Sequence, residues 1–381
     1  MPIDFIATAA FGLESVVARQ VRALGYTDVK IANGRVEFRG DEMALCRANL
    51  WLRSADRVLV KLGEFPATDF DQLFDQVKAL PWADWLPKDA AFPVNGKSLD
   101  SQLSSVPACQ AVVKKAIVES LKNHYHLEWF AETGPQYAIE VSLLKDIATI
   151  TIDTSGAGLH KRGYRKLSMP APLKETLAAA LVELSYWNPD RILLDPFCGS
   201  GTIPIEAALS GLNIAPGLQR RFAAEAWPVI PSGLWQTARE EAYDLVKRDS
   251  RLTIWGSDID SKVLSLARYH AKQAGVLEQI TFTRRPVAEL AVAEKYGCII
   301  CNPPYGERLG EKKEAEEVYR QMGRAFRPLE TWSVYVLTSH EGFERFYGRK
   351  ADRKRKLYNG RIRCDYYQFY GPKPPPGEPE S

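Results

Sequence analysis

RILLDPFCGSGT, residues 191–202, is the stretch of sequence that decides the fold. Its apolar run is typical of a buried strand, and its glycine-rich turn opens a helix. A second apolar run, YGCIICNPPYG at residues 296–306, leads into the polar motif NPPY at residues 302–305. Between them lies a third predicted strand, 253–257, which ends at Asp258. Parallel strands with polar residues at their carboxyl ends predict a ligand crevice along one edge of a sheet.

The surrounding sequence continues the same alternation of strands and helices. After residue 175 it predicts helices at 175–187, from Ser200, at 232–250 and at 260–275. This order predicts an α/β domain with a Rossmann-like, doubly wound sheet. The domain closes with a second Asn-Gly hairpin, YNGRIRCDYYQFYG, before a proline-rich tail that we expect to be disordered.

The N-terminal third predicts two smaller α+β domains. A strand at 4–8, a helix at 13–24 and a hairpin around Asn33-Gly34 form the first. Helices near 70–77 and 108–121, followed by two strands that turn at Lys145-Asp146, form the second. The expected domains are residues 1–60, 61–157, 165–371 and the tail 372–381.

Bulk properties set wide bounds. A chain of 381 residues exceeds one ordinary hydrophobic core, so several domains are expected. The net charge of +3 and the pI of about 8.4 neither require nor exclude a nucleic-acid partner. The start MPIDFIATAAFGLES is unlike a signal peptide, and no apolar run is long enough to span a bilayer. We therefore expect a cytoplasmic protein with no membrane partner.

Cysteine and histidine give little sign of a metal. The six cysteines are scattered, and Cys298 and Cys301 lie on a predicted strand. Because side chains alternate along a strand, these two thiols should point to opposite faces. His124 and His126 have no further ligands nearby in sequence. We expect reduced thiols and no metal site.

Three segments carry clustered basic residues. The junction GAGLHKRGYRKLSMPAPLKE, residues 156–175, surrounds Tyr164 with lysine and arginine. It is either a solvated connector or a strip that contacts phosphates and offers a ring for stacking. Residues 345–363 hold nine Arg and Lys, and Lys114 and Lys115 lie on the outer face of a predicted helix.

The glycine turn favours a nucleoside ligand. Gly199 and Gly201 permit a tight turn and close backbone approach, which would suit the methionine and ribose parts of S-adenosylmethionine (SAM). A nucleotide phosphate site is the competing interpretation, although no Gly-Lys-Ser/Thr is present. Asp258 could accept both ribose hydroxyls. Asp260 is better placed to cap the following helix.

The NPPY motif favours an exocyclic amine. Such an amine is a poor nucleophile because its lone pair is delocalised into the base. The side-chain carbonyl of Asn302 and the backbone carbonyl of Pro303 could accept its hydrogens, and Tyr305 could stack on the base. The sulfonium of SAM is already an activated methyl donor, so positioning would carry most of the catalysis. The alternative is a proline-stiffened turn without function.

With these residues in view, the sequence resembles the THUMP-domain class I SAM-dependent RNA methyltransferases. It looks most like the bacterial family that methylates guanine N2 in 23S ribosomal RNA. The resemblance covers most of the last two thirds of the chain, through GLHKRGYR (158–165), PLKETLAAAL (172–181), LLDPFCGSGTIPIEAAL (193–209), NIAPGLQRRFAAEAW (213–227), GSDID (256–260) and NPPYGERL (302–309). The N-terminal part resembles a ferredoxin-like domain followed by a THUMP domain.

The resemblance implies SAM as cofactor, S-adenosylhomocysteine as product, and structured RNA, 23S rRNA or a ribosomal precursor, as partner. The implied catalytic residues are Asn302, Pro303, Pro304 and Tyr305. Those expected to bind the cofactor are Asp195, Phe197, Cys198, Gly199, Ser200, Gly201, Thr202, Asp258 and Ile259. Those expected to bind RNA are Lys161, Arg162, Tyr164, Arg165, Lys114, Lys115, Arg353, Lys354 and Arg355.

One position departs from the family pattern. Such enzymes often place an acidic residue after the third strand to hold the adenine amine, whereas this chain has Pro286 there. Glu289 or backbone groups could replace it.

Two other functions stay open. NPPY also resembles the motif of N6-adenine DNA methyltransferases, although the THUMP-like part favours RNA. The other, from a different class, is an RNA-binding ribosome-assembly factor whose SAM site is vestigial. The intact Asp195, Asp258 and Asn302 argue against this function.

Overall fold

The computed structural model describes residues 2–167, 173–306 and 311–375. The chain forms two compact units. The first unit comprises residues 1–9, 17–159 and 220–241, and the second comprises residues 10–16, 160–219 and 242–381. Each unit is built on its own seven-stranded sheet.

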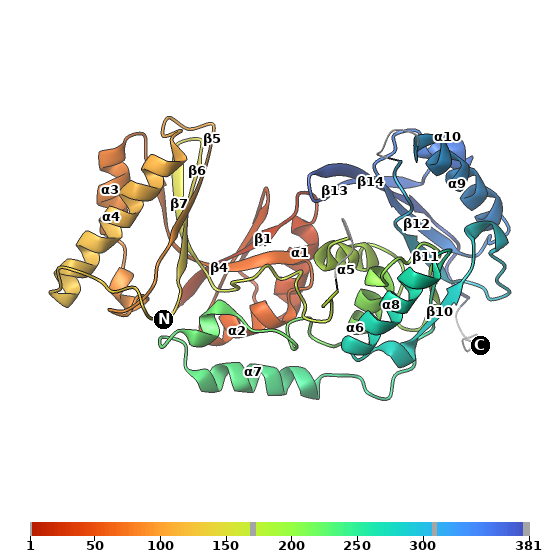
Figure 1. Ribbon diagram of the computed structural model, residues 1–381, viewed down its shortest axis with the longest axis horizontal. Coiled ribbons are helices and arrows are strands. Elements are labelled where there is room, and N and C mark those ends of the chain that lie inside the picture. The colour runs from red at the N-terminus through yellow and green to blue at the C-terminus, as the bar shows by residue number, and fades with distance from the viewer. Residues whose placement is uncertain (1, 168–172, 307–310, 376–381) are drawn as a thin grey trace. The chain divides into compact units, whose positions relative to one another are not determined.

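The first unit has the sheet order β2-β3-β1-β4-β7-β6-β5. All neighbours are antiparallel except β5 and β6. Its strands are β1 (Ile3–Ala9), β2 (Val29–Ala32), β3 (Arg35–Gly40), β4 (Ala55–Pro66), β5 (Val94–Leu99), β6 (Ala138–Leu144) and β7 (Ile147–Asp153). The helices of this part of the chain are α1 (Glu14–Ala23), α2 (Glu42–Trp51), α3 (Phe70–Lys78) and α4 (Val106–Tyr125), with α3 and α4 side by side (Figure 1).

Strand β4 belongs to both halves of this sheet. It pairs with β1 through Val60 opposite Phe5, and with β7 through Leu59 opposite Asp153. The domain boundary expected between residues 60 and 61 therefore falls inside a continuous strand of 12 residues. The two expected N-terminal domains share one sheet because β4 offers a hydrogen-bonding edge to each of them.

The second unit has the order β10-β9-β8-β11-β12-β14-β13. The first five of these strands are parallel, and the hairpin β13–β14 adds antiparallel to β12. This is the Rossmann-like, doubly wound sheet that the sequence predicted. Its strands are β8 (Leu193–Asp195), β9 (Ile254–Asp258), β10 (Ile280–Arg284), β11 (Cys298–Cys301), β12 (Ser333–Thr338), β13 (Arg353–Asn359) and β14 (Ile362–Phe369).

Helices cover both faces of this second sheet (Figure 1). One buried cluster joins it to α5 (Glu175–Glu183), α6 (Thr202–Gly211) and α8 (Ser261–Gln273). The other joins it to α9 (Glu311–Phe326) and α10 (Phe343–Tyr347). Cys298 belongs to the first cluster and Cys301 to the second, so the prediction that these thiols face opposite ways is confirmed.

Some elements differ from their expected bounds. Helix α7 (Ser232–Asp244) is shorter than the predicted 232–250. Beyond its end, the backbone N–H of Lys247 donates to the Leu212 carbonyl at 2.9 Å, which holds the chain against the end of α6. No described helix is long and apolar enough to cross a membrane. The tail was expected to be disordered, and from residue 376 onward it lies outside the described part of the chain.

Candidate active site

The site lies where the strand order of the second sheet reverses. β8 and β11 are neighbours, and the chain leaves β8 toward β9 on one side and β11 toward β12 on the other. Such a switch point opens a crevice beyond the carboxyl ends of the strands. Three segments meet there: the glycine turn after β8, Asp258 at the end of β9, and the NPPY motif after β11.

The glycine turn forms a cradle open to a ligand. Gly199 has φ +52°, and a Cβ on it would meet no atom within 4 Å. Gly201 has φ +85°, and a Cβ there would lie 3.1 Å from the Cβ of Ala267. One glycine thus leaves space in front of the turn, and the other lets the turn pack on α8. The start of α6 directly behind it adds the positive end of a helix dipole.

Asp258 ties the cradle to β9. Its carboxylate accepts the backbone N–H of Gly199 at 3.1 Å and that of Asp260 at 3.0 Å. Each carboxylate oxygen keeps a further acceptor position, which suits a pair of ribose hydroxyls. Next to it the side chain of Ile259 is 66% exposed, an apolar surface suited to a flat base. The open turn, the acid and this apolar surface fit SAM.

The prediction for Asp260 is confirmed. Its side chain accepts the backbone N–H of Lys262 at 2.8 Å and caps α8.

Asp195 lies beneath the turn. It is 1% exposed, and its carboxylate accepts the N–H of Phe197 at 3.0 Å. Burial raises the pKa of Asp195 well above its usual range, and the nearby charge of Asp258 raises it further. The Cys198 thiol points into the core, and burial raises its pKa as well. The Thr202 hydroxyl accepts a bond from Arg165. Within the turn, Cys198 and Thr202 therefore present backbone, and not side chains, to a ligand.

The NPPY motif presents an acceptor at the third strand end. The Tyr305 hydroxyl donates to the Asn302 Oδ1 at 2.5 Å. A carbonyl oxygen has two lone pairs, so Asn302 can accept a second bond from an incoming amine. Pro303 is buried and Pro304 is exposed. Asn302 and Tyr305 are thus already oriented toward each other.

A clamp behind the motif was missed in the sequence. The hydroxyl of Tyr319, on α9, donates to the Pro304 carbonyl at 2.7 Å and lies 3.0 Å from the Thr338 hydroxyl. Tyr319 is fully buried, which raises its pKa to about 12 and keeps it protonated. A tyrosine on the apolar face of a helix needs a buried partner for its hydroxyl, and that was the available signal.

Replacing Tyr319 with Phe is expected to lower kcat by roughly tenfold to a hundredfold, because a small displacement of reacting groups has effects of that size. The affinity for SAM should not change, since the clamp does not contact the glycine turn. Tyr347→Phe removes a hydroxyl from another tyrosine of the same core cluster and serves as the control. Steady-state kinetics with calorimetric SAM titration checks this, and an unchanged kcat for Tyr319→Phe would contradict it.

The basic junction corrects the sequence interpretation. Arg162 is 3% exposed and Tyr164 is 2% exposed, so neither forms a solvent-facing strip. Arg162 pairs with the fully buried Glu206 of α6 at 3.3 Å, and the Tyr164 hydroxyl donates to the same carboxylate at 3.1 Å. Arg165 pairs with Glu175 at 3.2 Å. These three side chains anchor the junction to helices α5 and α6. The burial of Arg162 and Tyr164 argues against contact with RNA, and the assignment of all three residues to RNA stays a prediction.

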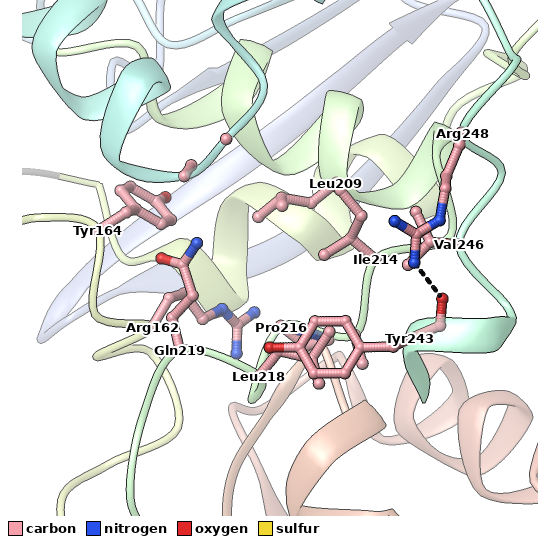
Figure 2. A pocket seen from close by; sticks show the side chains of 13 residues that line it. Arg162, Tyr164, Leu209, Ile214, Pro216, Leu218, Gln219, Tyr243, Val246 and Arg248 are labelled. Atoms are coloured by element: carbon pink, nitrogen blue, oxygen red, sulfur yellow. Dashed lines mark hydrogen bonds between the residues drawn. The ribbon is translucent and has the colours of Figure 1, made fainter. Parts of the chain in front are cut away.

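Arg162 and Tyr164 line a cavity of about 220 Å³ (Figure 2). Helix α6 runs back from the glycine turn, so its last turn with Leu209 lies toward the opposite edge of the sheet. Figure 2 shows Leu209 and Ile214 across the cavity from Tyr243, and Arg248 donates to the Tyr243 carbonyl at 3.2 Å. The cavity is therefore separate from the carboxyl ends that carry the motifs.

Glu206→Gln is expected to lower the free energy of unfolding by about 3–5 kcal/mol, because it leaves the buried Arg162 charge uncompensated. Glu317→Gln removes an acid from an ion pair with Arg320 in which both side chains are over two fifths exposed. It should cost less than about 1 kcal/mol. Denaturant unfolding of both variants checks the difference, and equal effects would rule out a structural role for the Glu206 pair.

The other cations assigned to RNA have mixed surroundings. Lys115, Lys161, Arg353 and Lys354 are exposed, although Lys354 also pairs with Glu344. Lys114 bonds both the Phe92 carbonyl and Glu132. Their contact with RNA stays a prediction. Glu289, which could replace the missing acid at Pro286, is exposed at the end of the single helical turn Val287–Glu289.

Comparison with known families divides the chain in the same order. The RlmL ferredoxin-like domain matches residues 4–59 and the THUMP domain matches residues 67–153. The RMKL-like methyltransferase domain matches residues 162–368, which is more than half of the chain. That last match contains all three segments of the crevice.

Individual relatives agree with this division. YpsC, a candidate RNA methyltransferase of Bacillus subtilis, is 55% identical over 96% of this chain and 95% of its own. A Listeria monocytogenes protein, described as a predicted N6-adenine-specific DNA methylase, is 53% identical with a TM-score of 0.94, covering 98% of this chain and 97% of its own. SMU.472, a candidate methyltransferase in complex with S-adenosylhomocysteine, is 45% identical with a TM-score of 0.93 and covers 98% and 99%. This chain therefore belongs to the RMKL-like methyltransferases, in the form that carries RlmL-type ferredoxin-like and THUMP domains.

Proposed function

We propose that this protein transfers a methyl group from SAM to the exocyclic N2 of a guanine in ribosomal RNA, with 23S rRNA as the substrate. It is a SAM-dependent RNA methyltransferase, as its family and its relatives indicate. The base and the RNA are the new parts of the proposal. They rest on the THUMP domain, on the RlmL-type N-terminal domain and on the chemistry of the NPPY motif.

The observation that supports the proposal is the Asn302–Tyr305 hydrogen bond at the carboxyl end of β11, the strand that pairs with β8, where the glycine turn begins. In the reaction the amine nitrogen forms a bond to the methyl carbon while the carbon–sulfur bond breaks, and the amine then releases a proton to solvent. SAM supplies the activated methyl group. Asn302 Oδ1 and the Pro303 carbonyl accept the amine hydrogens, which directs the nitrogen lone pair at the methyl group. Tyr305 holds the Asn302 amide and offers a ring to the base.

The target base has to leave its stack to reach this motif. Exposed cations on β13, Arg353 and Lys354, support phosphate contacts near the crevice. Phosphate contacts release counterions, so the affinity for RNA should fall as salt rises.

Adenine N6 is the second candidate base. Asn302 and Tyr305 can hold the adenine amine by the same contacts. The Listeria protein, 53% identical, is described as a predicted N6-adenine-specific DNA methylase. The THUMP domain favours RNA over DNA as substrate. A third possibility is an RNA-binding assembly factor without turnover, and the complete cradle with its NPPY motif argues against it.

The test is mass spectrometry of ribosomal RNA nucleosides from cells that lack this protein, compared with wild-type cells. We expect one N2-methylguanosine to disappear and to return with the wild-type protein but not with Asn302→Ala. Loss of N6-methyladenosine instead would leave the fold and the cofactor as stated and change the proposed target base from guanine to adenine. Unchanged RNA nucleosides would overturn the proposal and favour DNA or an assembly role.

A further inference from the structure

The edge of the second sheet carries an aromatic and basic cluster at the height of the NPPY motif. It consists of Phe11, Lys356 and Tyr358, named here the Phe11 platform. The ring of Phe11 lies 6.0 Å from that of Tyr358 at an angle of 84°. The Lys356 ammonium lies 6.0 Å from the centre of the Phe11 ring and 5.7 Å from that of Tyr358. We propose that the Phe11 platform stacks an unpaired base of the RNA close to the methylated nucleotide.

Strand register places the platform level with the active site. Cys301 of β11 aligns with Val336 of β12, which aligns with Tyr367 of β14 and then with Lys354 of β13. β13 runs in the same direction as β11. Lys356 and Tyr358 therefore lie further along β13, toward the same end of the sheet as the NPPY residues that follow Cys301 on β11.

The lateral separation suits a neighbouring nucleotide. Three inter-strand spacings separate β11 from β13, which amounts to roughly 14 Å at about 4.8 Å each. A base extruded into the crevice leaves its neighbours unstacked, and proteins hold such bases on aromatic rings with cations beside the phosphates. The platform supplies both kinds of contact.

The backbone holds Phe11 outward. Its ring is 50% exposed. The next residue, Gly12, has φ +89°, and a Cβ on it would come within 2.6 Å of the Lys356 carbonyl oxygen. The Arg355 guanidinium donates to the Gly12 carbonyl at 3.3 Å. The segment therefore presses against β13, so a ligand would meet a ring already fixed in position.

The charge of the platform suits an anion. Lys354, Arg355 and Lys356 follow one another on this edge strand. Asp365 stands opposite Lys356 in the strand register, yet no ion pair joins Lys356 to any residue that the structure describes. A phosphate beside a stacked base would meet this ammonium group. The chemistry therefore favours a nucleotide over an apolar peptide.

The test uses an oligouridylate that carries 5-iodouridine, which cross-links to stacked aromatic rings. With the wild-type protein, we expect the cross-linked peptide to contain Phe11 or Tyr358. Phe11→Leu keeps an apolar side chain but removes the ring, and it should lose the Phe11 cross-link and weaken RNA affinity about tenfold. Phe11→Trp should keep both. Tyr186→Leu removes a 55% exposed ring that packs against Tyr335 near the start of β12, at the amino-terminal end of the parallel strands, and should leave affinity unchanged.

The inference rests on the proposed action on RNA, and the results separate the two. If the wild-type protein binds the oligouridylate and methylates rRNA, but Phe11→Leu binds equally well or the cross-link lies elsewhere, the platform is refuted alone. If the wild-type protein neither binds nor methylates RNA, both proposals fail. Retained SAM binding and an unchanged melting temperature in Phe11→Leu exclude misfolding as the cause of weaker RNA binding.

Discussion

Asn302→Ala is expected to lower the rate of methyl transfer by about 10²–10³-fold, the range seen when one positioned hydrogen-bonding group is removed from an active site. Alanine removes the acceptor that orients the amine, and it also leaves the Tyr305 hydroxyl without its bond to Oδ1. The glycine turn and Asp258 are untouched, so SAM should bind with unchanged affinity. Single-turnover transfer to rRNA from cells lacking the protein measures the chemical step directly.

Asn302→Asp is the matched variant. A carboxylate keeps an oxygen in the same place, so it should retain more activity than alanine while SAM binding stays the same. A rate for Asn302→Ala equal to that of the wild type would leave NPPY as a structural turn. Weakened SAM binding by both variants would instead place Asn302 in the cofactor site.

Asp258→Ala is expected to weaken SAM binding by about 100-fold. Hydrogen bonds to charged groups are each worth about 1.5–3 kcal/mol, and alanine removes the carboxylate that would accept such bonds from the ribose hydroxyls. It would also release the N–H of Gly199 and loosen the turn. A hundredfold change corresponds to about 2.7 kcal/mol, well within reach of isothermal titration with SAM or S-adenosylhomocysteine.

Asp260→Ala gives the control two residues away. It removes the cap of α8, which should cost about 1 kcal/mol of stability. It should leave SAM affinity unchanged, because the Asp260 side chain bonds the helix backbone. Equal losses of affinity in the two variants would mean that Asp258 acts by shaping the loop, and normal affinity in Asp258→Ala would remove it from the cofactor site.

Local sequence patterns predicted the parts of the site that depend on local structure. Asp260 caps its helix because an acid before a helical pattern bonds the first turn. Cys298 and Cys301 separate because strand side chains alternate. The crevice followed from three strands with polar ends, since parallel strands bring those ends to one edge. Each inference needed only a few neighbouring residues.

Long-range pairing limited the rest. The sequence suggested that Arg162 and Tyr164 could belong to an exposed strip, because their buried partner Glu206 is not nearby in sequence. Glu206 lies more than forty residues later, in a run of apolar and small residues. Tyr319 reads as an ordinary core residue until the fold brings the Pro304 carbonyl to its hydroxyl. The Phe11 platform joins residues at opposite ends of the chain. No periodicity in the sequence reports such pairs.

The shared strand β4 constrains how this architecture can change. Side chains alternate along a strand, so inserting one residue would turn the core-facing residues of everything beyond it toward solvent. β4 already contains such an irregularity, a register shift against β7 between Lys61 and Gly63. The shift lies just past Val60, the last residue that pairs with β1. The strand register of the THUMP half is therefore separate from that of the ferredoxin-like half. An insertion or deletion in one half can change its register without changing the register of the other.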